Sequence, residues 1–245
     1  MAIEKGSLYL IPTPLGEVPV DQVIPAYNLE IIYRIDVFIV EELRTARRFL
    51  KRCGYKKDFD SVTFYTLNEH TQDVEMTGFL DKAMQGTPIG LLSEAGCPTV
   101  ADPGTSVVTH AHQKGIRVIP LTGPSSILLS LMASGLNGQQ FTFHGYLPVK
   151  SQERKQKIKE LDRSAQRVPF DKSAQRLPHT HIFIEAPYRN KQMIDSLLET
   201  CSANTLLCIA SNITMPDESI KTKSISDWKK NKPDPGKNPT VYLLS

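Results

Sequence analysis

In the first half of the chain, short apolar segments alternate with segments of helical pattern, and this alternation restricts the possible folds more than any other feature. The apolar runs are SLYLIP (7–12), IDVFIVEE (35–42), PIGLLS (88–93) and IRVIPLTG (116–123). Between them lie the helix-like stretches ELRTARRFLKR, EMTGFLDKAMQ and GTSVVTHAHQK. Such alternation predicts βαβ units around a mostly parallel sheet, in which ligands bind at the loops that leave the carboxyl ends of the strands.

The second half has strands of a different character. After an apolar helix predicted at 125–134, partly alternating apolar and polar residues occupy 141–147, 181–187, 206–213, 219–225 and 240–245. This pattern is typical of a mixed or antiparallel sheet. We place a boundary near residue 122 and expect two α/β lobes, 1–122 and 123–245.

The segment 148–179 is the most basic part of the chain. It combines a charged helical stretch, QERKQKIKELDR, with a loop in which SAQRVP is nearly repeated as SAQRLP. Its cations include Lys155, Lys157, Lys159, Arg163, Arg167, Lys172 and Arg176. Two interpretations stay open: a solvated helix with an exposed loop, or a contact surface for a polyanionic substrate.

Composition excludes several classes of protein. A hydrophobic content of 40% and a charged content of 22% over 245 residues are typical of a folded chain and not of a disordered one. The net charge of +3 permits a phosphate-bearing partner without requiring one. The N-terminus has no signal-peptide pattern, and no apolar run is long enough to span a membrane. The 4 cysteines are scattered without metal-ligand spacing, so we expect reduced thiols, no metal site and a cytoplasmic protein.

The candidate binding loops share small residues, proline turns and hydroxyl groups. Dinucleotide, Walker, nucleophile-elbow and HExxH motifs are all absent from the sequence. Five loops of small residues instead follow predicted strands: TPLGE (13–17), SEAGCPTVADPG (93–104), TGPSS (122–126), EAPYR (185–189) and ASN (210–212). Such residues let backbone groups approach a ligand closely, which predicts a small polar ligand held between the two lobes.

Taken in order, these loops resemble the tetrapyrrole methylase superfamily of S-adenosylmethionine-dependent methyltransferases. The blocks that carry the resemblance are LYLIPTPLGE, VEELRTARRFL, LLSEAGCPTVADPGTSVV, VIPLTGPSSILLSLMASGL with FTFHGYLP, and IFIEAPYR. They are most similar to the ribosomal RNA small-subunit methyltransferase I branch, which methylates a cytidine 2′-hydroxyl. The resemblance covers roughly residues 7–215.

The resemblance implies that S-adenosylmethionine lies in the cleft between the lobes and that the protein forms a homodimer. The residues implied to bind the cofactor are Leu15, Glu94, Gly96, Cys97, Val100, Ser125, Ser126, Ala186, Thr240 and Val241. Methyl transfer from a sulfonium is mainly a positioning problem, but a ribose hydroxyl must also lose its proton to a base. The candidate bases are Glu41, Asp102 and Glu185, with Arg44 and Arg189 as phosphate clamps; a helix cap or a salt bridge is an equally good role for each acid.

The chain departs from the pattern of this branch at places that concern the substrate. The Glu-Asp-Thr-Arg segment reads Glu41-Glu42-Leu43-Arg44, and the substrate-side stretch reads TLNEHT, which leaves Asn68, Glu69 and His70. The resemblance also implies a C-terminal extension in the RNA enzymes, whereas the sequence here ends at TVYLLS. RNA or the small ribosomal subunit is the expected partner. A precorrin-type small-molecule methylase and a non-catalytic cofactor- or RNA-binding regulator are the alternatives.

Overall fold

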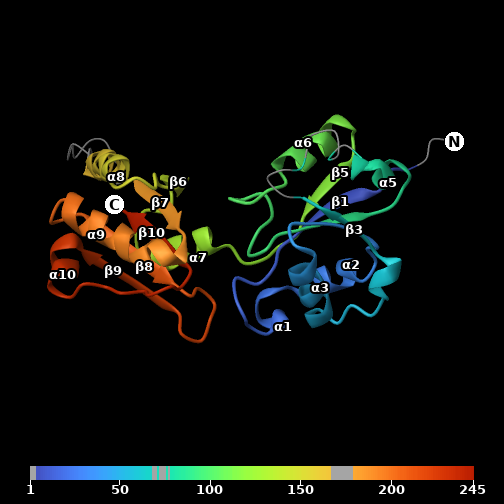
Figure 1. The fold of residues 1–245 in the computed structure, drawn as a ribbon, viewed down its shortest axis with the longest axis horizontal. Helices are drawn as coiled ribbons and strands as arrows, with labels where there is room; N and C mark the ends of the chain where they lie inside the picture. Colours follow the sequence, from blue (N-terminus) through green and yellow to red (C-terminus); the bar gives the residue numbers. More distant parts are fainter. Residues whose placement is uncertain (1–3, 68–70, 72–75, 77, 167–178) are drawn as a thin grey trace. The chain divides into compact units, whose positions relative to one another are not determined.

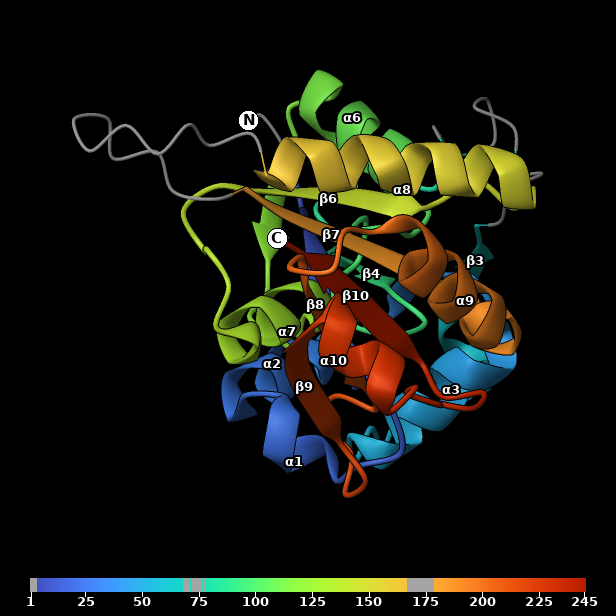
Figure 2. The same cartoon turned by 90° about the vertical axis from the view of Figure 1, so that its left-hand side faces the viewer.

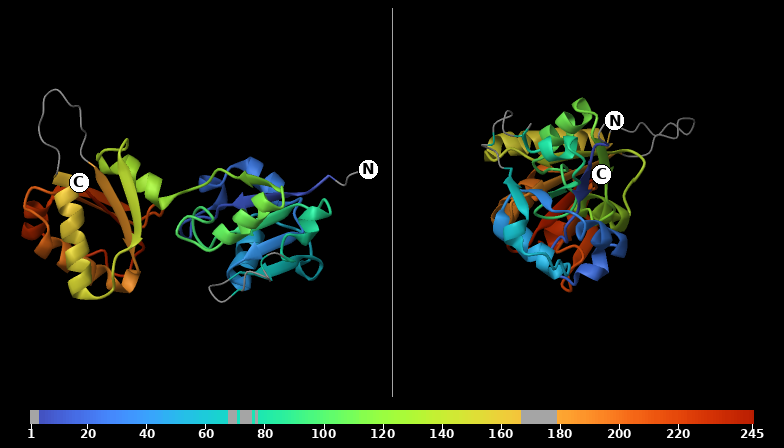
Figure 3. Two further views of the ribbon diagram at one scale, coloured as in Figure 1. Left: turned by 90° about the horizontal axis from the view of Figure 1, so that it is seen from above. Right: turned by 90° about the vertical axis from the view of Figure 1, so that its right-hand side faces the viewer.

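The computed structural model describes residues 4–67, 71, 76, 78–166 and 179–245. Within it the chain divides into two compact units, Met1–Ser125 and Ser126–Ser245. Each unit has its own five-stranded sheet with its own helices (Figures 1 and 3). The two units are described separately below.

Unit 1 is built on an entirely parallel sheet in the order β3-β2-β4-β1-β5. Its strands are β1 (Ser7–Ile11), β2 (Val37–Val40), β3 (Thr63–Thr66), β4 (Ile89–Leu92) and β5 (Arg117–Pro120). Its helices are α1 (Val20–Val23), α2 (Ala26–Ile32), α3 (Leu43–Arg52), η1 (Phe59–Ser61), α5 (Asp81–Met84) and α6 (Thr105–Gln113). Because parallel strands are joined by crossovers, every strand of this sheet ends at the same edge.

Helices cover both faces of the parallel sheet, which explains why its central strands are continuously apolar. In β2, Phe38 and Val40 pack into one core with residues of α1, α2 and α3. The alternate residues Val37 and Ile39 pack into a second core with residues of α5 and α6. Figure 1 shows these two groups of helices on opposite sides of the strands. All four β2 side chains are therefore buried.

Unit 2 is built on a mixed sheet in the order β6-β7-β10-β8-β9. Its strands are β6 (Phe141–Tyr146), β7 (Thr180–Glu185), β8 (Leu206–Ser211), β9 (Ser219–Ser224) and β10 (Thr240–Leu244). Its helices are α7 (Ser126–Ser134), α8 (Ser151–Gln166), η2 (Pro187–Arg189), α9 (Asn190–Thr200) and α10 (Ile225–Lys230). Only β6 and β7 run parallel; the other neighbours are antiparallel.

The core of unit 2 lies between its sheet and the helices α8, α9 and α10, seen together in Figure 2. Trp228 of α10 is buried there and donates its indole N–H to the carbonyl of Leu207 at 2.8 Å. Tyr242 of β10 is fully buried and donates its hydroxyl to Asn190 at 3.0 Å. Both bonds satisfy polar atoms that would otherwise be costly to bury.

The predicted fold class is confirmed, with a first sheet that is wholly parallel and a second that is mixed. The sequence interpretation missed β3, α1, α2 and α10. The substrate-side residues 68–70 and the basic residues Arg167, Lys172 and Arg176 lie outside the described residues, as does most of the repeated hexapeptide. Within the described part of the chain, no helix is both long and apolar enough to cross a bilayer.

Candidate functional site

The loops of unit 1 that carry predicted site residues all leave the carboxyl edge of the parallel sheet. Leu15 follows β1, Glu41 follows β2, and the 93–104 loop follows β4. Ser125 lies beyond β5, directly before α7, whose first residue is Ser126. In open parallel sheets this edge is where ligands bind.

The loops after β1, β4 and β5 are joined to one another by close backbone contacts. Thr13 and Gly96 form an isolated antiparallel bridge with two hydrogen bonds, of 3.0 and 3.1 Å. The thiol of Cys97 lies 3.5 Å from the carbonyl oxygen of Pro124. Gly96 has φ +79°, and a Cβ there would lie 3.1 Å from a methyl carbon of Leu15. This conformation favours glycine, and a side chain would also have to displace Leu15 by a few tenths of an ångström.

The second half of the 93–104 loop holds its backbone in an uncommon conformation. Thr99 has φ 69° and Ala101 has φ 60°, although neither residue is glycine. Left-handed conformations cost such residues about 1–2 kcal/mol each, and they concentrate at functional sites. The strained pair flanks Val100, which is exposed, and directly precedes Asp102.

Glu41 and Asp102 form a pair of carboxyl groups joined by a side-chain hydrogen bond. Burial, followed by the hydrogen bond and the charge of Asp102, raises the pKa of Glu41 from 4.5 to about 8. Burial also raises the pKa of Asp102, and the nearby charge of Glu94 adds to that rise. Two carboxylates cannot hydrogen-bond unless one of them carries a proton, so near neutral pH the pair shares one.

One carboxylate oxygen of Glu41, Oε1, is buried and accepts no hydrogen bond from a donor group in the part of the chain that the structure describes. A buried oxygen without a partner is costly in a folded protein and marks a place where a donor is expected. Glu41 therefore combines a raised pKa with a buried oxygen that accepts from no described donor.

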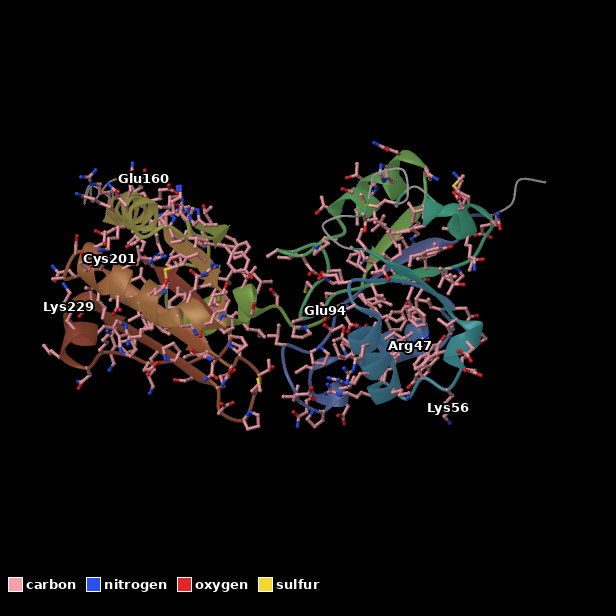
Figure 4. The ribbon with its side chains drawn as sticks, viewed as in Figure 1. Arg47, Lys56, Glu94, Glu160, Cys201 and Lys229 are labelled. Atoms are coloured by element: carbon pink, nitrogen blue, oxygen red, sulfur yellow. The ribbon has the colours of Figure 1, made fainter. Side chains whose placement is uncertain are left out.

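Thr45 is a site residue that the sequence interpretation missed. Its hydroxyl lies 2.7 Å from Oε1 of Glu94, on the loop labelled in Figure 4, and 2.9 Å from the carbonyl of Glu42. Glu42 is the N-cap of α3 and accepts hydrogen bonds from the backbone N–H groups of Arg44 and Thr45, which lower its pKa. The hydroxyl missing at Leu43 is thus present two residues later, and the capping pattern at the start of the helix was the available signal.

A small hollow of about 180 Å³ opens between these loops and α3. It is lined by Thr13, Pro14, Leu15, Gly16, Glu17, Thr45, Ala46, Arg48, Phe49, Arg52, Leu92, Ser93, Glu94 and Ala95. Arg52 donates to the carbonyl of Val18 and pairs with Glu17 at 3.4 Å. The hollow therefore has acidic and basic groups on its walls together with exposed backbone.

In unit 2, Glu185 and Arg189 form a buried ion pair. The carboxylate oxygen Oε1 of Glu185 accepts from the backbone N–H of Ala186 at 2.8 Å. The same oxygen accepts from Nε of Arg189 at 2.7 Å and lies 2.6 Å from its Nη2. The side chain of Glu185 is fully buried, so Arg189 neutralises a carboxylate that would be very costly to bury alone. The guanidinium also lies over the ring of Tyr188, 5.3 Å from its centroid.

Ala186, Thr240 and Val241 lie near one another at one end of the mixed sheet. Thr240 lies opposite Glu185 on one side and Ser211 on the other. Its hydroxyl is 3.0 Å from that of Ser211 and donates to the carbonyl of Asn238 at 2.9 Å. The threonine side chain is therefore engaged within the protein, which leaves the strand end and Ala186 as the surface available to a ligand.

Comparison with known sequences assigns almost the whole chain to one family profile. The profile described as Tetrapyrrole (Corrin/Porphyrin) Methylases matches residues 8–228. The protein named Ribosomal RNA small subunit methyltransferase I from Vibrio cholerae is 29% identical over 220 residues, which cover 90% of this chain and 69% of that protein. The protein of the same name from Mesorhizobium japonicum is 31% identical over 221 residues, covering 90% and 68%. The Haemophilus influenzae relative is 28% identical over 242 residues, covering 98% and 78%.

Solved structures share the fold at much lower sequence identity. The methyltransferase CobJ superposes with a TM-score of 0.62 at 14% identity, covering 98% of this chain and 94% of that one. A uroporphyrin III C-methyltransferase from Thermus thermophilus gives a TM-score of 0.56 at 16% identity, covering 98% and 97%. These similarities show that the chain shares its fold with these two methyltransferase structures.

Proposed function

This chain belongs to the tetrapyrrole methylase family of methyltransferases, and we propose that it methylates RNA of the small ribosomal subunit with S-adenosylmethionine as the methyl donor. Support for the substrate comes from relatives named as ribosomal RNA small subunit methyltransferase I, which match at 28–31% identity across most of the chain. The observation that carries the proposed chemistry is the Glu41–Asp102 pair at the carboxyl edge of the parallel sheet.

The loops of unit 1 fit a flat polar cofactor. Gly96 has φ +79°, and a Cβ there would press on the side chain of Leu15, so the loop turns with its peptide groups close to Leu15 and Pro124. We propose that Leu15, Gly96, Cys97 and Val100 of unit 1 hold S-adenosylmethionine. When bound, this cofactor supplies an electrophilic methyl group on a positively charged sulfur.

The residues of this chain supply the proton chemistry. A hydroxyl acceptor must lose its proton as it is methylated, and the buried Oε1 of Glu41 is an acceptor without a partner among the described residues. Once Glu41 is deprotonated, its carboxylate takes that proton, and Asp102 then holds the resulting acid through their hydrogen bond. The rate of methyl transfer should therefore rise with pH and level off above about 8, because only the deprotonated Glu41 is a base.

We propose a ribose 2′-hydroxyl, in a cytidine, as the target. Of the three candidate bases, Glu41 is the one whose pKa is raised to about 8 beside a second carboxyl group, whereas Glu185, which also has a buried oxygen without a partner among the described residues, is held by Arg189. Arg189 is accordingly proposed as a structural partner of Glu185 and not as a phosphate clamp. We also propose a cytoplasmic location, because ribosomal RNA is found there. We propose a homodimer as well, which light scattering at micromolar concentration tests.

The decisive experiment measures transfer of a radiolabelled methyl group from S-adenosylmethionine to isolated small ribosomal subunits, to naked small-subunit RNA and to a precorrin-type tetrapyrrole. We expect labelled RNA, with the label retained on the nucleoside as a 2′-O-methyl group. Glu41→Gln should lower the rate constant by about 10²–10⁴-fold, the usual contribution of a general base. The matched control is Glu42→Gln, which changes the same side chain at a helix cap and should keep most of the activity.

Labelling of the tetrapyrrole alone would refute the RNA assignment and favour the small-molecule alternative. Cofactor binding without transfer to any of the three acceptors would favour a regulator that has lost catalysis. A thermal-shift measurement with S-adenosylmethionine comes first. A ligand that binds the native state raises the melting temperature when its concentration exceeds its dissociation constant.

A further inference from the structure

Helix α3 carries four cations on one face. Arg44, Arg47, Arg48 and Lys51 follow the spacing i, i+3, i+4 and i+7, which places them on adjacent turns of the same side. Ala46, Phe49 and Leu50 face the core on the opposite side. Among the described side chains, the ion pairs of unit 1 involve Arg52, Lys57 and Lys114 and none of these four cations.

This arrangement of charges lowers the stability of helix α3. Like charges three and four residues apart repel one another along a helix. Arg44 also lies in the first turn, where the helix dipole disfavours a positive charge. A polyanion placed against this face would remove both unfavourable terms, so the charge pattern is consistent with a binding surface and not with a helix optimised for stability.

The same cations line an open groove with an aromatic wall. The groove has a volume of about 560 Å³ and is lined by Glu42, Leu43, Arg44, Arg47, Arg48, Lys51 and Phe59. The guanidinium of Arg47, labelled in Figure 4, lies 5.6 Å from the ring centroid of Phe59 and 5.5 Å from that of Phe64. Lys51 lies 5.9 Å from the ring of Phe59. These contacts hold the two cations in place before any ligand arrives.

Arg47 has a further property that favours a ligand here. Its Nε is buried and has no hydrogen-bond partner in the described part of the chain. The buried Nε is out of reach of a ligand in the groove, so the donors available to a phosphate are the terminal N–H groups, which pair with no described carboxylate. The planar cation and the ring of Phe59 also offer faces on which bases can stack.

We propose that this groove, the basic groove of α3, binds the phosphodiester backbone of single-stranded RNA during methylation. The proposal rests on the function proposed above and assigns to it a substrate surface in unit 1. The basic helix α8 is less suited to this role, because Lys155 pairs with Glu199 at 2.7 Å and Lys157 with Glu160 at 3.4 Å. Arg154 of the same helix is buried and binds Ser196.

The test measures binding of a fluorescein-labelled single-stranded oligouridylate by anisotropy over a series of salt concentrations. The variant R47Q/K51Q removes two charges from the groove, and the control K155Q/K157Q removes two from α8. Each lost phosphate contact should lower the slope of log K against log salt by about 0.7, so the groove variant should lose about 1.4 and bind about tenfold more weakly at physiological salt. The control should change the slope by much less, and both proteins should keep the thermal shift with S-adenosylmethionine.

An unchanged slope in R47Q/K51Q, or an equal loss in the α8 control, would overturn the proposal. Competition with polyglutamate gives a second test. If polyglutamate displaces the labelled RNA as effectively as unlabelled oligouridylate of equal charge, the groove is a general anion surface and the proposal is overturned. Because Arg47 is partly buried, the exposed single variant Lys51→Glu gives the same test without risk to the fold. If the wild type methylates subunits and R47Q/K51Q binds RNA as tightly as the wild type, the role of the groove is refuted and the proposed function stands. If R47Q/K51Q loses RNA binding but the wild type methylates no RNA, the proposed function is refuted and the role of the groove stands.

Discussion

The shared proton of Glu41 and Asp102 predicts an unusual pH dependence for the stability of unit 1. The folded-state pKa of Glu41, about 8, lies above its ordinary value of 4.5. Between these values the folded protein binds more protons than the unfolded chain, so stability must fall as pH rises through that range. This trend is opposite to that of a carboxylate held in a salt bridge. Glu41→Gln keeps the side chain neutral at every pH, so in the variant this decline should be absent.

The size of the effect follows from the shift. One pKa unit corresponds to about 1.4 kcal/mol, so raising the pH from about 5 to about 7 destabilises the wild type by at most about 2.7 kcal/mol through this group. Glu41 is partly exposed and solvent screens part of that cost, so we expect about 1–2 kcal/mol. Gln at this position can donate an amide N–H to Asp102 and so replaces the shared proton.

The assay is equilibrium urea unfolding at a series of pH values, followed by circular dichroism and by tryptophan fluorescence. The single tryptophan, Trp228, is buried in unit 2 and reports on that unit, which makes it an internal control. Glu41→Gln should match the wild type near pH 5 and exceed it near pH 7 by about 1–2 kcal/mol in the transition of unit 1. Glu42→Gln should instead be less stable than the wild type near pH 7, because its carboxylate caps α3. Equal pH slopes in wild type and Glu41→Gln would refute the shared proton.

Three further predictions concern single groups. Burial lowers the pKa of His181 to about 4. Unit 2 should therefore keep its stability above about pH 6.5 and lose up to about 3 kcal/mol as the pH falls toward 4. Urea unfolding followed by tryptophan fluorescence measures this loss, and a stability that does not change with pH would contradict it. Gly96→Ala should cost about 1 kcal/mol at φ +79° and reduce the thermal shift with S-adenosylmethionine, whereas Gly138→Ala, with open space around it, should do neither. Arg189→Gln should destabilise unit 2 by about 3 kcal/mol in urea unfolding because Glu185 stays buried without its cation, and a smaller loss in Arg189→Gln/Glu185→Gln would confirm that cause.

Patterns within short segments of sequence were sufficient for most of the fold. Continuous apolar runs identified β1, β2, β4 and β5, and in the central strands β2 and β4 helices bury both faces. The edge strand β3 was missed because its residues, TFYT, are only partly buried and form no apolar run. Helices α1 and α2 were missed because Pro19 and Pro25 precede them, and prolines in a short stretch resemble a loop even where they begin a helix.

The site was predicted less well, because its chemistry depends on distances between residues far apart in sequence. The loops and their small residues were identified, but Glu41 and Asp102 are separated by many residues, and only the structure shows their hydrogen bond. The partner of Lys155 is similarly distant, since Glu199 comes from a different helix. A salt bridge was one of the roles left open for Glu185 from the sequence, and the structure identifies Arg189 as its partner.

Helix α3 joins the two parts of the proposed function within unit 1. Its first turn is capped by Glu42 and places the hydroxyl of Thr45 against Glu94, so the start of the helix positions the acidic side of the site. Its outer face carries the cations of the basic groove, and Arg48 lines both this groove and the smaller hollow. A strand of RNA held on that face would therefore be held at a fixed distance from the carboxyl pair by one rigid element. Changes that shift α3 should accordingly weaken RNA binding and catalysis together, whereas changes confined to its exposed cations should weaken binding alone.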